Sequence, residues 1–207
     1  MESQFILASA SPRRKEILQK LNIPFDIVPG DFEENYNHFD EGTEPEEVVI
    51  HFSYCKGKSI AGNNPDKLII SADTIVVIDG KLLGKPKNRN DAEAMLEKLS
   101  NKTHEVFTGV SIQKNEIHFE FTEKTEVTFY SLSKTMINEY ILKYPPFDKA
   151  GSYGIQDWSA VFVEKINGCF YNVVGFPLPK FVQIMQKPEV CSKFRLNNWL
   201  ENVVVQS

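Results

Sequence analysis

The sequence lacks the features of a membrane, secreted or zinc-binding protein. No apolar run approaches the ~20 residues that span a bilayer, and the polar start has no cationic segment before an apolar one, so no signal peptide is expected. Three cysteines, Cys55, Cys169 and Cys191, are too few and too widely spaced for a disulfide framework or a zinc knuckle. We therefore expect reduced thiols in a cytoplasmic protein without membrane contact.

Positive charge is also in short supply. The 23 lysines and arginines are outnumbered by 28 acidic residues, which gives a net charge of −5. Nucleic-acid binding favours a basic face, so no nucleic-acid partner is expected. An acidic protein can still bind phosphate if its cations gather in one place. The chain has 207 residues, 42% of them hydrophobic, and no long linker, which suits one large domain or two small lobes.

Apolar patterning predicts strands and helices that are mixed along the chain rather than strictly alternating. This favours an α/β fold with a mixed sheet and flanking helices. The expected strands cover 5–8, 25–28, 68–72, 75–78, 106–112, 117–130 and a hairpin of 160–166 with 169–174 closed by Asn167-Gly168. The expected helices have N-caps at Ser11, Thr43, Asn90 and Ser133, and a last core helix covers 177–185. Pro12 is expected as the first residue of the helix after Ser11, and Asp79-Gly80 is expected to form a tight turn.

The first candidate site is the loop from Ser9 to Ser11 and the helix that follows it. Free N–H groups at a helix start attract anions, whereas Arg13 and Arg14 in the first turn are unfavourable there unless an anion joins them. Two guanidinium groups can grip polyphosphate oxygens bidentately. Two solvated arginines on a surface helix are an equally good interpretation of these residues alone.

The second candidate is Asp73, which the pattern places at the end of an apolar strand. Ligands of α/β folds bind at strand ends, and a carboxylate there can hold Mg²⁺ or Mn²⁺ or accept a proton from water. A turn aspartate that bonds its own backbone is the alternative. Lys56 and Lys85 can contact phosphate, Glu34 can add a metal ligand, and Gln156 in a glycine-rich loop can read a base edge, although each alone is a weak signal.

Six segments in order resemble one family, the Maf family of nucleoside triphosphate pyrophosphatases, from about residue 5 to 181. They are LASASPRR (7–14), SADTIVV (71–77), LGKP (83–86), HEVFTGV (104–110), DKAGSYGIQ (148–156) and VVGFPL (173–178). The resemblance implies two lobes around a deep cleft, often a homodimer, and hydrolysis of a nucleoside triphosphate to the monophosphate and pyrophosphate with Mg²⁺, Mn²⁺ or Co²⁺. It also implies a house-cleaning role in nucleotide metabolism.

The resemblance assigns roles residue by residue. Asp73 matches the catalytic carboxylate, and Glu34 matches a functional glutamate after the second strand. We expect Asp73, Glu34 or both to bind the metal. The phosphate-binding positions correspond to Ser9, Ser11, Arg14, Lys56 and Lys85, and the base-selecting positions correspond to Arg13, Thr74 and Gln156. Arginine, threonine and glutamine at these last three positions are typical of the branch that hydrolyses dTTP and UTP. The branch acting on 7-methyl-GTP has tryptophan, glutamine and glutamate instead.

The chain departs from the family pattern in two segments. Residues 51–57 keep Lys56 but have unusual flanks, and Asp157-Trp158-Ser159 replaces a small, glycine-containing stretch. Modified pyrimidine nucleotides therefore stay open as substrates, and the alternatives are a 7-methyl-GTP pyrophosphatase or a non-catalytic nucleotide-binding regulator of cell division. We expect a catalytic domain over 1–186 and a tail of uncertain order over 187–207.

Overall fold

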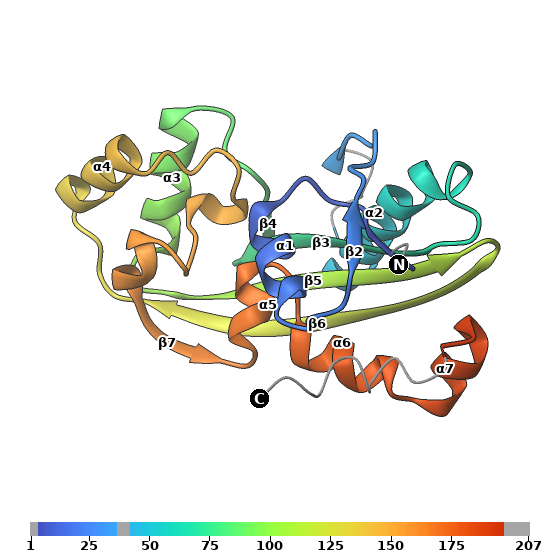
Figure 1. Cartoon of the computed structure of the whole chain (residues 1–207). Coiled ribbons are helices and arrows are strands. Elements are labelled where there is room, and N and C mark those ends of the chain that lie inside the picture. Colours follow the sequence, from blue (N-terminus) through green and yellow to red (C-terminus); the bar gives the residue numbers. More distant parts are fainter. Residues whose placement is uncertain (1–3, 37–41, 197–207) are drawn as a thin grey trace. The chain divides into compact units, whose positions relative to one another are not determined.

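The chain opens with a strand–helix–strand unit of β1 (Phe5–Leu7), α1 (Pro12–Gln19) and β2 (Phe25–Ile27). These elements belong to a computed structural model that describes residues 4–36 and 42–196 (Figure 1). Both β2 and β3 pair with β1 in parallel, as expected for strands joined by crossovers. Ser11 is the N-cap of α1 and Pro12 its first residue, as predicted, but the Ser11 side chain makes no capping hydrogen bond.

Helix α2 (Pro45–Ala61) and strand β3 (Leu68–Ile78) form the centre of the fold. The predicted N-cap at Thr43 is wrong: Glu44 caps the helix, because Pro45 forces its predecessor into an extended conformation and suits the first helical position. The two strands predicted over 68–72 and 75–78 are one strand. Asp73 is therefore in the interior of β3, not at its end.

Strand β3 turns back into β4 (Lys81–Leu83) through the predicted Asp79-Gly80 turn. The remaining elements are α3 (Arg89–Leu99), β5 (Thr103–Lys114), β6 (Ile117–Phe129), α4 (Lys134–Lys143), the 3₁₀ turns η2 (Ala150–Ser152) and η3 (Trp158–Phe162), β7 (Val163–Asn167), α5 (Phe170–Val174), α6 (Leu178–Met185) and α7 (Pro188–Phe194). In the described residues, seven strands form one sheet of order β2-β1-β3-β5-β6-β7, with β4 on β3. Parallel and antiparallel pairs occur together, which confirms the α/β class with a mixed sheet.

Two further predictions from the pattern are wrong. Asn88, rather than Asn90, caps α3, and its side chain accepts a hydrogen bond from the Asp91 N–H. The hairpin predicted at Asn167-Gly168 is absent, because the apolar run that follows it forms α5. Asn172 of α5 donates to the Thr125 hydroxyl and to a β5 carbonyl, so the tertiary contacts favour a helix for a run that also suits a strand.

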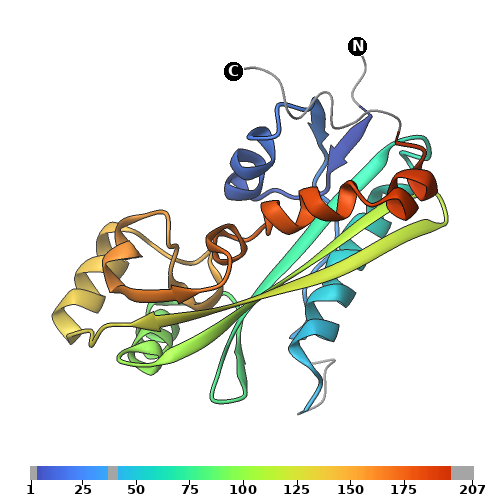
Figure 2. The ribbon, with the colours of Figure 1, turned by 90° about the horizontal axis from the view of Figure 1, so that it is seen from below.

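The chain divides into two compact units, and the first comprises residues 1–73, 108–123 and 175–207. In this unit α2 covers one face of the sheet, and α6 with α7 covers the other (Figures 1 and 2). The Ser71 hydroxyl on β3 donates to the Ser53 carbonyl of α2 at 2.6 Å, and Lys180 of α6 pairs with Glu123 of β6 at 2.8 Å. The part of the tail that the structure describes forms α7, and residues 197–207 lie outside the described residues.

The second unit comprises residues 74–107 and 124–174. Its core contains the aromatic side chains of Phe129, Tyr140 and Phe162, none of them accessible to solvent. Tyr140 meets Phe162 edge-on with ring centroids 5.1 Å apart, a favourable arrangement of ring quadrupoles. No helix within residues 4–36 and 42–196 is long and apolar enough to cross a membrane.

Candidate active site

Asp73 is a buried carboxylate placed just beyond the parallel part of the sheet. Strand β1 ends at Leu7 opposite Ile70, whereas β3 continues past it, so Asp73 lies beyond the carboxyl end of β1. Ligands of parallel sheets bind in this position, so Asp73 remains a candidate for ligand binding although it is not at a strand end. Its side chain is 3% exposed, and its Oδ2 atom has no hydrogen-bond partner among the described residues.

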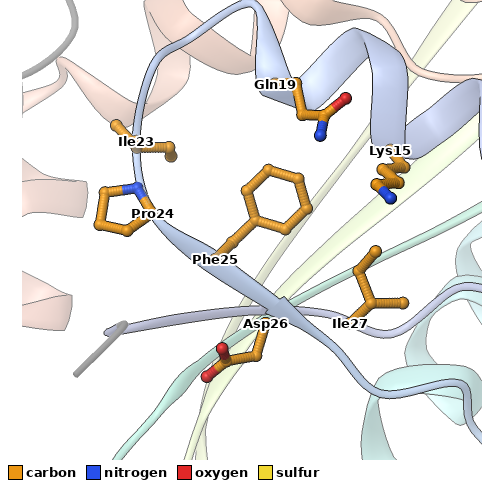
Figure 3. Close-up of a pocket in the computed structure, with 7 residues that line it drawn as sticks. All are labelled: Lys15, Gln19, Ile23, Pro24, Phe25, Asp26 and Ile27. Carbon is orange, nitrogen blue, oxygen red and sulfur yellow. The ribbon is translucent and has the colours of Figure 1, made fainter.

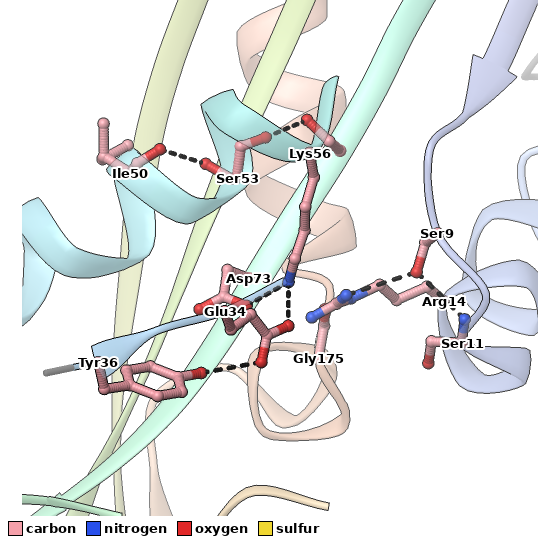
Figure 4. A network of polar contacts seen from close by, with 11 residues as sticks. Ser9, Ser11, Arg14, Glu34, Tyr36, Ile50, Ser53, Lys56, Asp73 and Gly175 are labelled. Atoms are coloured by element: carbon pink, nitrogen blue, oxygen red, sulfur yellow. Dashed lines mark hydrogen bonds and ion pairs between the residues drawn. The ribbon is translucent and has the colours of Figure 1, made fainter. Parts of the chain in front are cut away.

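Lys56 joins two carboxylates that come from different elements (Figure 4). Its Nζ atom lies 2.5 Å from Oδ1 of Asp73 and 2.5 Å from Oε1 of Glu34, which follows β2 in the chain. The side chains of Lys56 and Glu34 are only 13% and 15% exposed. A buried charge needs a partner. The Lys56 ammonium is the shared counter-ion of the Asp73 and Glu34 carboxylates.

Close packing of α2 on the sheet brings Lys56 within reach of Asp73. The backbone carbonyl of Ser53 on α2 accepts a hydrogen bond from the Ser71 hydroxyl. The backbone carbonyl of Tyr54, also on α2, accepts one from the side-chain amide of Gln113. A Cβ atom on Gly57 would collide with the side chains of Ser71 and Gln113. The glycine therefore allows the helix to lie closer to β3 than a larger residue would.

Tyr36 supports the cluster from the side of Glu34. Its hydroxyl donates to Oε2 of Glu34 at 3.1 Å, and its ring meets the buried Phe52 edge-on at 4.8 Å between centroids. Burial, followed by the nearby carboxylates of Asp73 and Glu34, raises the pKa of Tyr36. The Tyr36 hydroxyl is therefore protonated near neutral pH and donates to Glu34.

On the expectation that Glu34 binds a divalent metal, replacing Tyr36 with phenylalanine should raise the metal concentration needed for half-maximal activity by about tenfold. The estimate follows from the loss of one charge-assisted hydrogen bond that orients Glu34. The measurement is a metal titration of turnover. Tyr54→Phe removes a hydroxyl from α2 and keeps the ring contact with His118, so it is the matched control. An unchanged metal requirement in Tyr36→Phe would show that this hydroxyl does not orient Glu34.

Arg14 adds a guanidinium to the same site. Its Nε atom donates to the Gly175 carbonyl at 2.9 Å, and Nη1 lies 3.4 Å from the Ser9 hydroxyl, which also accepts from the Ser11 N–H at 3.2 Å. Burial lowers the pKa of Arg14, and the carboxylates of Asp73 and Glu34 oppose that shift. The Arg14 guanidinium points toward the two carboxylates in Figure 4.

The donor set of this cluster fits a hard divalent cation. Glu34 and Asp73 offer carboxylate oxygens, the ligands that Mg²⁺ and Mn²⁺ prefer. The unpartnered Oδ2 of Asp73 is suited to such a bond. No group of three or more His, Cys, Asp or Glu side chains in the described part of the chain has metal-binding geometry. Two carboxylates with phosphate oxygens and water completing the shell is the usual pattern for Mg²⁺ at phosphate sites.

The predicted site residues therefore fall into two groups. The first unit brings together the side chains of Glu34, Lys56, Asp73 and Arg14, with Ser9 and Ser11 beside Arg14. Arg13 is partly exposed on α1. Lys85, Thr74 and Gln156 belong to the second unit.

Within the second unit, the loops that carry Lys85 and Gln156 touch. The Gly84 carbonyl accepts the Gly151 N–H at 3.1 Å, and both Lys85 and Gln156 are exposed. Thr74 is the residue after Asp73 in β3, and successive side chains of a strand point to opposite faces.

Sequence reasoning did not find Tyr36 or the carbonyl of Gly175. Gly175 lies within the VVGFPL segment, which was recognised as a family match but given no role. No local pattern marks Tyr36, because its importance depends on where the chain after β2 meets α2.

A separate pocket of about 460 Å³ lies between α1 and β2 and contains none of the predicted site residues (Figure 3). Lys15 contributes a positive charge to the lining of this pocket, and Asp26 of β2 contributes a negative charge. A triphosphate needs several cations that converge, so this pocket is a poor candidate for the phosphate site. It is lined by Lys15, Gln19, Ile23, Pro24, Phe25, Asp26 and Ile27.

Comparison with known proteins places the chain in a family. Residues 4–188 match the family described as Maf-like protein, and the chain belongs to that family. A Bacillus cereus protein named dTTP/UTP pyrophosphatase is 43% identical over 187 residues, which are 90% of this chain and 96% of the relative. A Bacillus cytotoxicus protein of the same name is 43% identical over 184 residues, 89% of this chain and 95% of the relative.

One solved structure, the Ham1 protein of Staphylococcus aureus, is similar at 14% identity with a TM-score of 0.42. The similarity covers 60% of this chain and 71% of that chain. The α/β class of the fold is established by the sheet and helices described above.

Proposed function

We propose that this protein is a nucleoside triphosphate pyrophosphatase that hydrolyses dTTP and UTP to the monophosphate and pyrophosphate. The observation that carries the proposal is the buried cluster of Asp73, Glu34 and Lys56 with Arg14 directed toward it. Its residues are those at which this chain matches the family's functional positions. The names of the Bacillus relatives support the choice of pyrimidine triphosphates.

In the proposed reaction, a water oxygen forms a bond to the α-phosphorus, and the bond from that phosphorus to the α–β bridging oxygen breaks. Pyrophosphate leaves with the bonding electrons, and the water loses a proton. Asp73 accepts that proton on Oδ2, the oxygen that has no partner within the described residues. Asp73 as a pure metal ligand is the alternative role, and the two roles share this atom.

The cationic side chains of the proposed site bind the phosphate oxygens. Arg14 already donates to Gly175 and Ser9, which holds its guanidinium in place for phosphate oxygens. Lys56 is paired with two carboxylates, so it exchanges one of these contacts for a phosphate oxygen when substrate binds. With Lys85 these groups stabilise the charge that develops on the leaving pyrophosphate.

Glu34, Asp73 or both would hold the divalent cation, Mg²⁺, Mn²⁺ or Co²⁺. When bound, such a cation polarises phosphate oxygens and neutralises their charge. We propose a cytoplasmic homodimer without a nucleic-acid partner as the setting of this activity. Size-exclusion chromatography with light scattering tests the dimer directly.

Base selection is proposed to depend on Arg13, Thr74 and Gln156. A glutamine amide donates to a pyrimidine carbonyl and accepts from the ring N–H, whereas a glutamate offers acceptors alone. We expect dTTP and UTP to be hydrolysed faster than 7-methyl-GTP. Gln156→Glu should reduce that preference by about tenfold or more, because polar groups of a binding site that are left without their hydrogen-bond partners discriminate strongly between ligands. Gln19→Glu on the exposed face of α1 is the control for the added charge.

A panel of triphosphates tests the function as a whole. Pyrophosphate release is measured at one sub-saturating concentration for all common triphosphates, 7-methyl-GTP and modified pyrimidine nucleotides, with each metal and with a chelator. Faster hydrolysis of 7-methyl-GTP than of both dTTP and UTP would replace the proposed substrate. Nucleotide binding without pyrophosphate release under every condition would instead favour a regulatory binding protein.

A further inference from the structure

The loop around Gln156 is closed by a dense set of hydrogen bonds. The side chain of Ser159 is fully buried, and its Oγ lies 2.8 Å from the Gly154 carbonyl and 2.8 Å from Oδ1 of Asp157. The same Oγ accepts the Gly154 N–H at 3.0 Å. One serine therefore ties together the residues on both sides of Gln156.

Asp157 extends this connection to the start of the loop. Its Oδ1 also accepts the Ser159 N–H at 3.2 Å, and its backbone N–H donates to the Gly154 carbonyl at 3.0 Å. Its Oδ2 lies 3.6 Å from Nζ of Lys149, which also pairs with Asp148. We call the contacts among Lys149, Gly154, Asp157 and Ser159 the loop brace.

Aromatic side chains anchor the loop brace at both ends. Before Gln156, the Tyr153 hydroxyl lies 2.8 Å from Nε2 of His104, whose pKa burial lowers to about 4, so this contact does not change near neutral pH. After Gln156, the Trp158 ring stacks on Tyr144 with 6° between the planes and 6.1 Å between centroids. The backbone is thereby held on either side of an exposed glutamine.

We propose that Ser159 and Asp157 are positioning residues that fix the backbone at Gln156 and thereby determine how well the protein discriminates between bases. This inference rests on the proposed function, which assigns base selection to Gln156. An exposed amide discriminates only if its backbone is held, because a displacement of about 1 Å weakens paired hydrogen bonds severely. In this chain the hydrogen bonds of Asp157 and Ser159 supply that support.

The test compares two Ser→Ala variants within the same unit. Ser159→Ala deletes the brace hydroxyl, and Ser100→Ala deletes a hydroxyl that accepts the Leu132 N–H at 2.8 Å. The readout is the ratio of kcat/KM for dTTP to that for dGTP. We expect Ser159→Ala to lower the ratio about tenfold, as one orienting hydrogen bond implies, and Ser100→Ala to leave it unchanged while lowering the melting temperature. Asp157→Ala, at a side chain 31% exposed, repeats the test without emptying a buried position.

A double-variant cycle shows whether the brace acts through Gln156. In a Gln156→Ala background, adding Ser159→Ala is expected to leave the ratio unchanged, because the group being positioned is already gone. A further fall in that background, or an unchanged ratio in both Ser159→Ala and Asp157→Ala, overturns the inference.

The design separates this inference from the proposed function. If the substrate panel identifies other preferred bases, the proposed substrate fails, and the ratio is taken between the fastest and slowest triphosphates of the panel. If no triphosphate is hydrolysed, the same variants are compared by the ratio of binding affinities for these nucleotides, so the brace is tested in either case.

Discussion

Asp73→Asn is expected to fold normally and to lose at least about 10²-fold of turnover, the usual contribution of a general base. Asparagine has nearly the same shape, and its amide oxygen can still accept from Lys56, which lies 2.5 Å from Oδ1 in the wild type. What it loses is the negative charge and the ability to take a proton at Oδ2. The measurements are pyrophosphate release with saturating metal and the melting temperature.

Asp66→Asn is the matched control for this variant. Asp66 is exposed and precedes the same strand, so removing its charge is expected to leave turnover within about twofold, as for surface substitutions in general. Near-normal turnover by a folded Asp73→Asn protein at limiting as well as at saturating metal would exclude both of the roles proposed for Asp73. A loss of turnover that appears at limiting metal and disappears at saturating metal would favour the role of metal ligand over that of base.

Lys56→Met is expected to lower both turnover and stability. Methionine fills most of the volume but leaves Asp73 and Glu34 without their shared cation. Breaking a buried ion pair in this way typically costs about 3 kcal/mol, equivalent to a fall in melting temperature of roughly 6–12 °C for a chain of this size. Turnover should fall at least about 10²-fold, because a charge directed at the phosphates is gone.

Two comparisons make the Lys56 result specific. Lys58 lies two residues further along α2, is half exposed and pairs with Glu116 at 3.8 Å, so Lys58→Met should change stability by no more than about 0.5 kcal/mol. Adding Glu34→Gln to Lys56→Met removes one uncompensated carboxylate and should recover part of the lost melting temperature without recovering turnover. A Lys56→Met protein that keeps its turnover would show that the cluster is structural.

Local sequence signals predicted the elements whose boundaries depend on local chemistry. Ser11 with Pro12 marks the start of α1, Asp79-Gly80 closes the β3–β4 turn, and Ser133 caps α4 through the Met136 N–H. Each depends on the backbone preferences of one or two residues, which do not change with tertiary context.

The wrong predictions share a different cause. The run after Gly168 has the apolar content of a strand, but Asn172 finds partners on β5 and β6 only when the run is helical. Strand β3 crosses the polar pair Asp73-Thr74 without a break, although that pair interrupts the apolar pattern. Long-range contacts decide both cases, and single-sequence patterns do not contain them.

The same division applies to the candidate site. Asp73, Lys56, Glu34 and Arg14 were named from motifs, and the structure brings their side chains into one cluster. Tyr36 was missed because its hydroxyl matters only through its distance to Glu34. The sequence also did not predict that Lys56 bonds both carboxylates, because these contacts depend on how closely α2 packs against β3.

The stack of Trp158 on Tyr144 gives the protein an optical reporter beside the residue proposed to read the base. An indole in contact with a phenol and 38% exposed emits light that depends on how far the two rings are apart and on how much water reaches them. The sequence contains only one other tryptophan, Trp199, which lies outside the described residues. A Trp199→Phe protein would thus carry a single tryptophan, two residues from Gln156, whose fluorescence can follow nucleotide binding in real time and without any label.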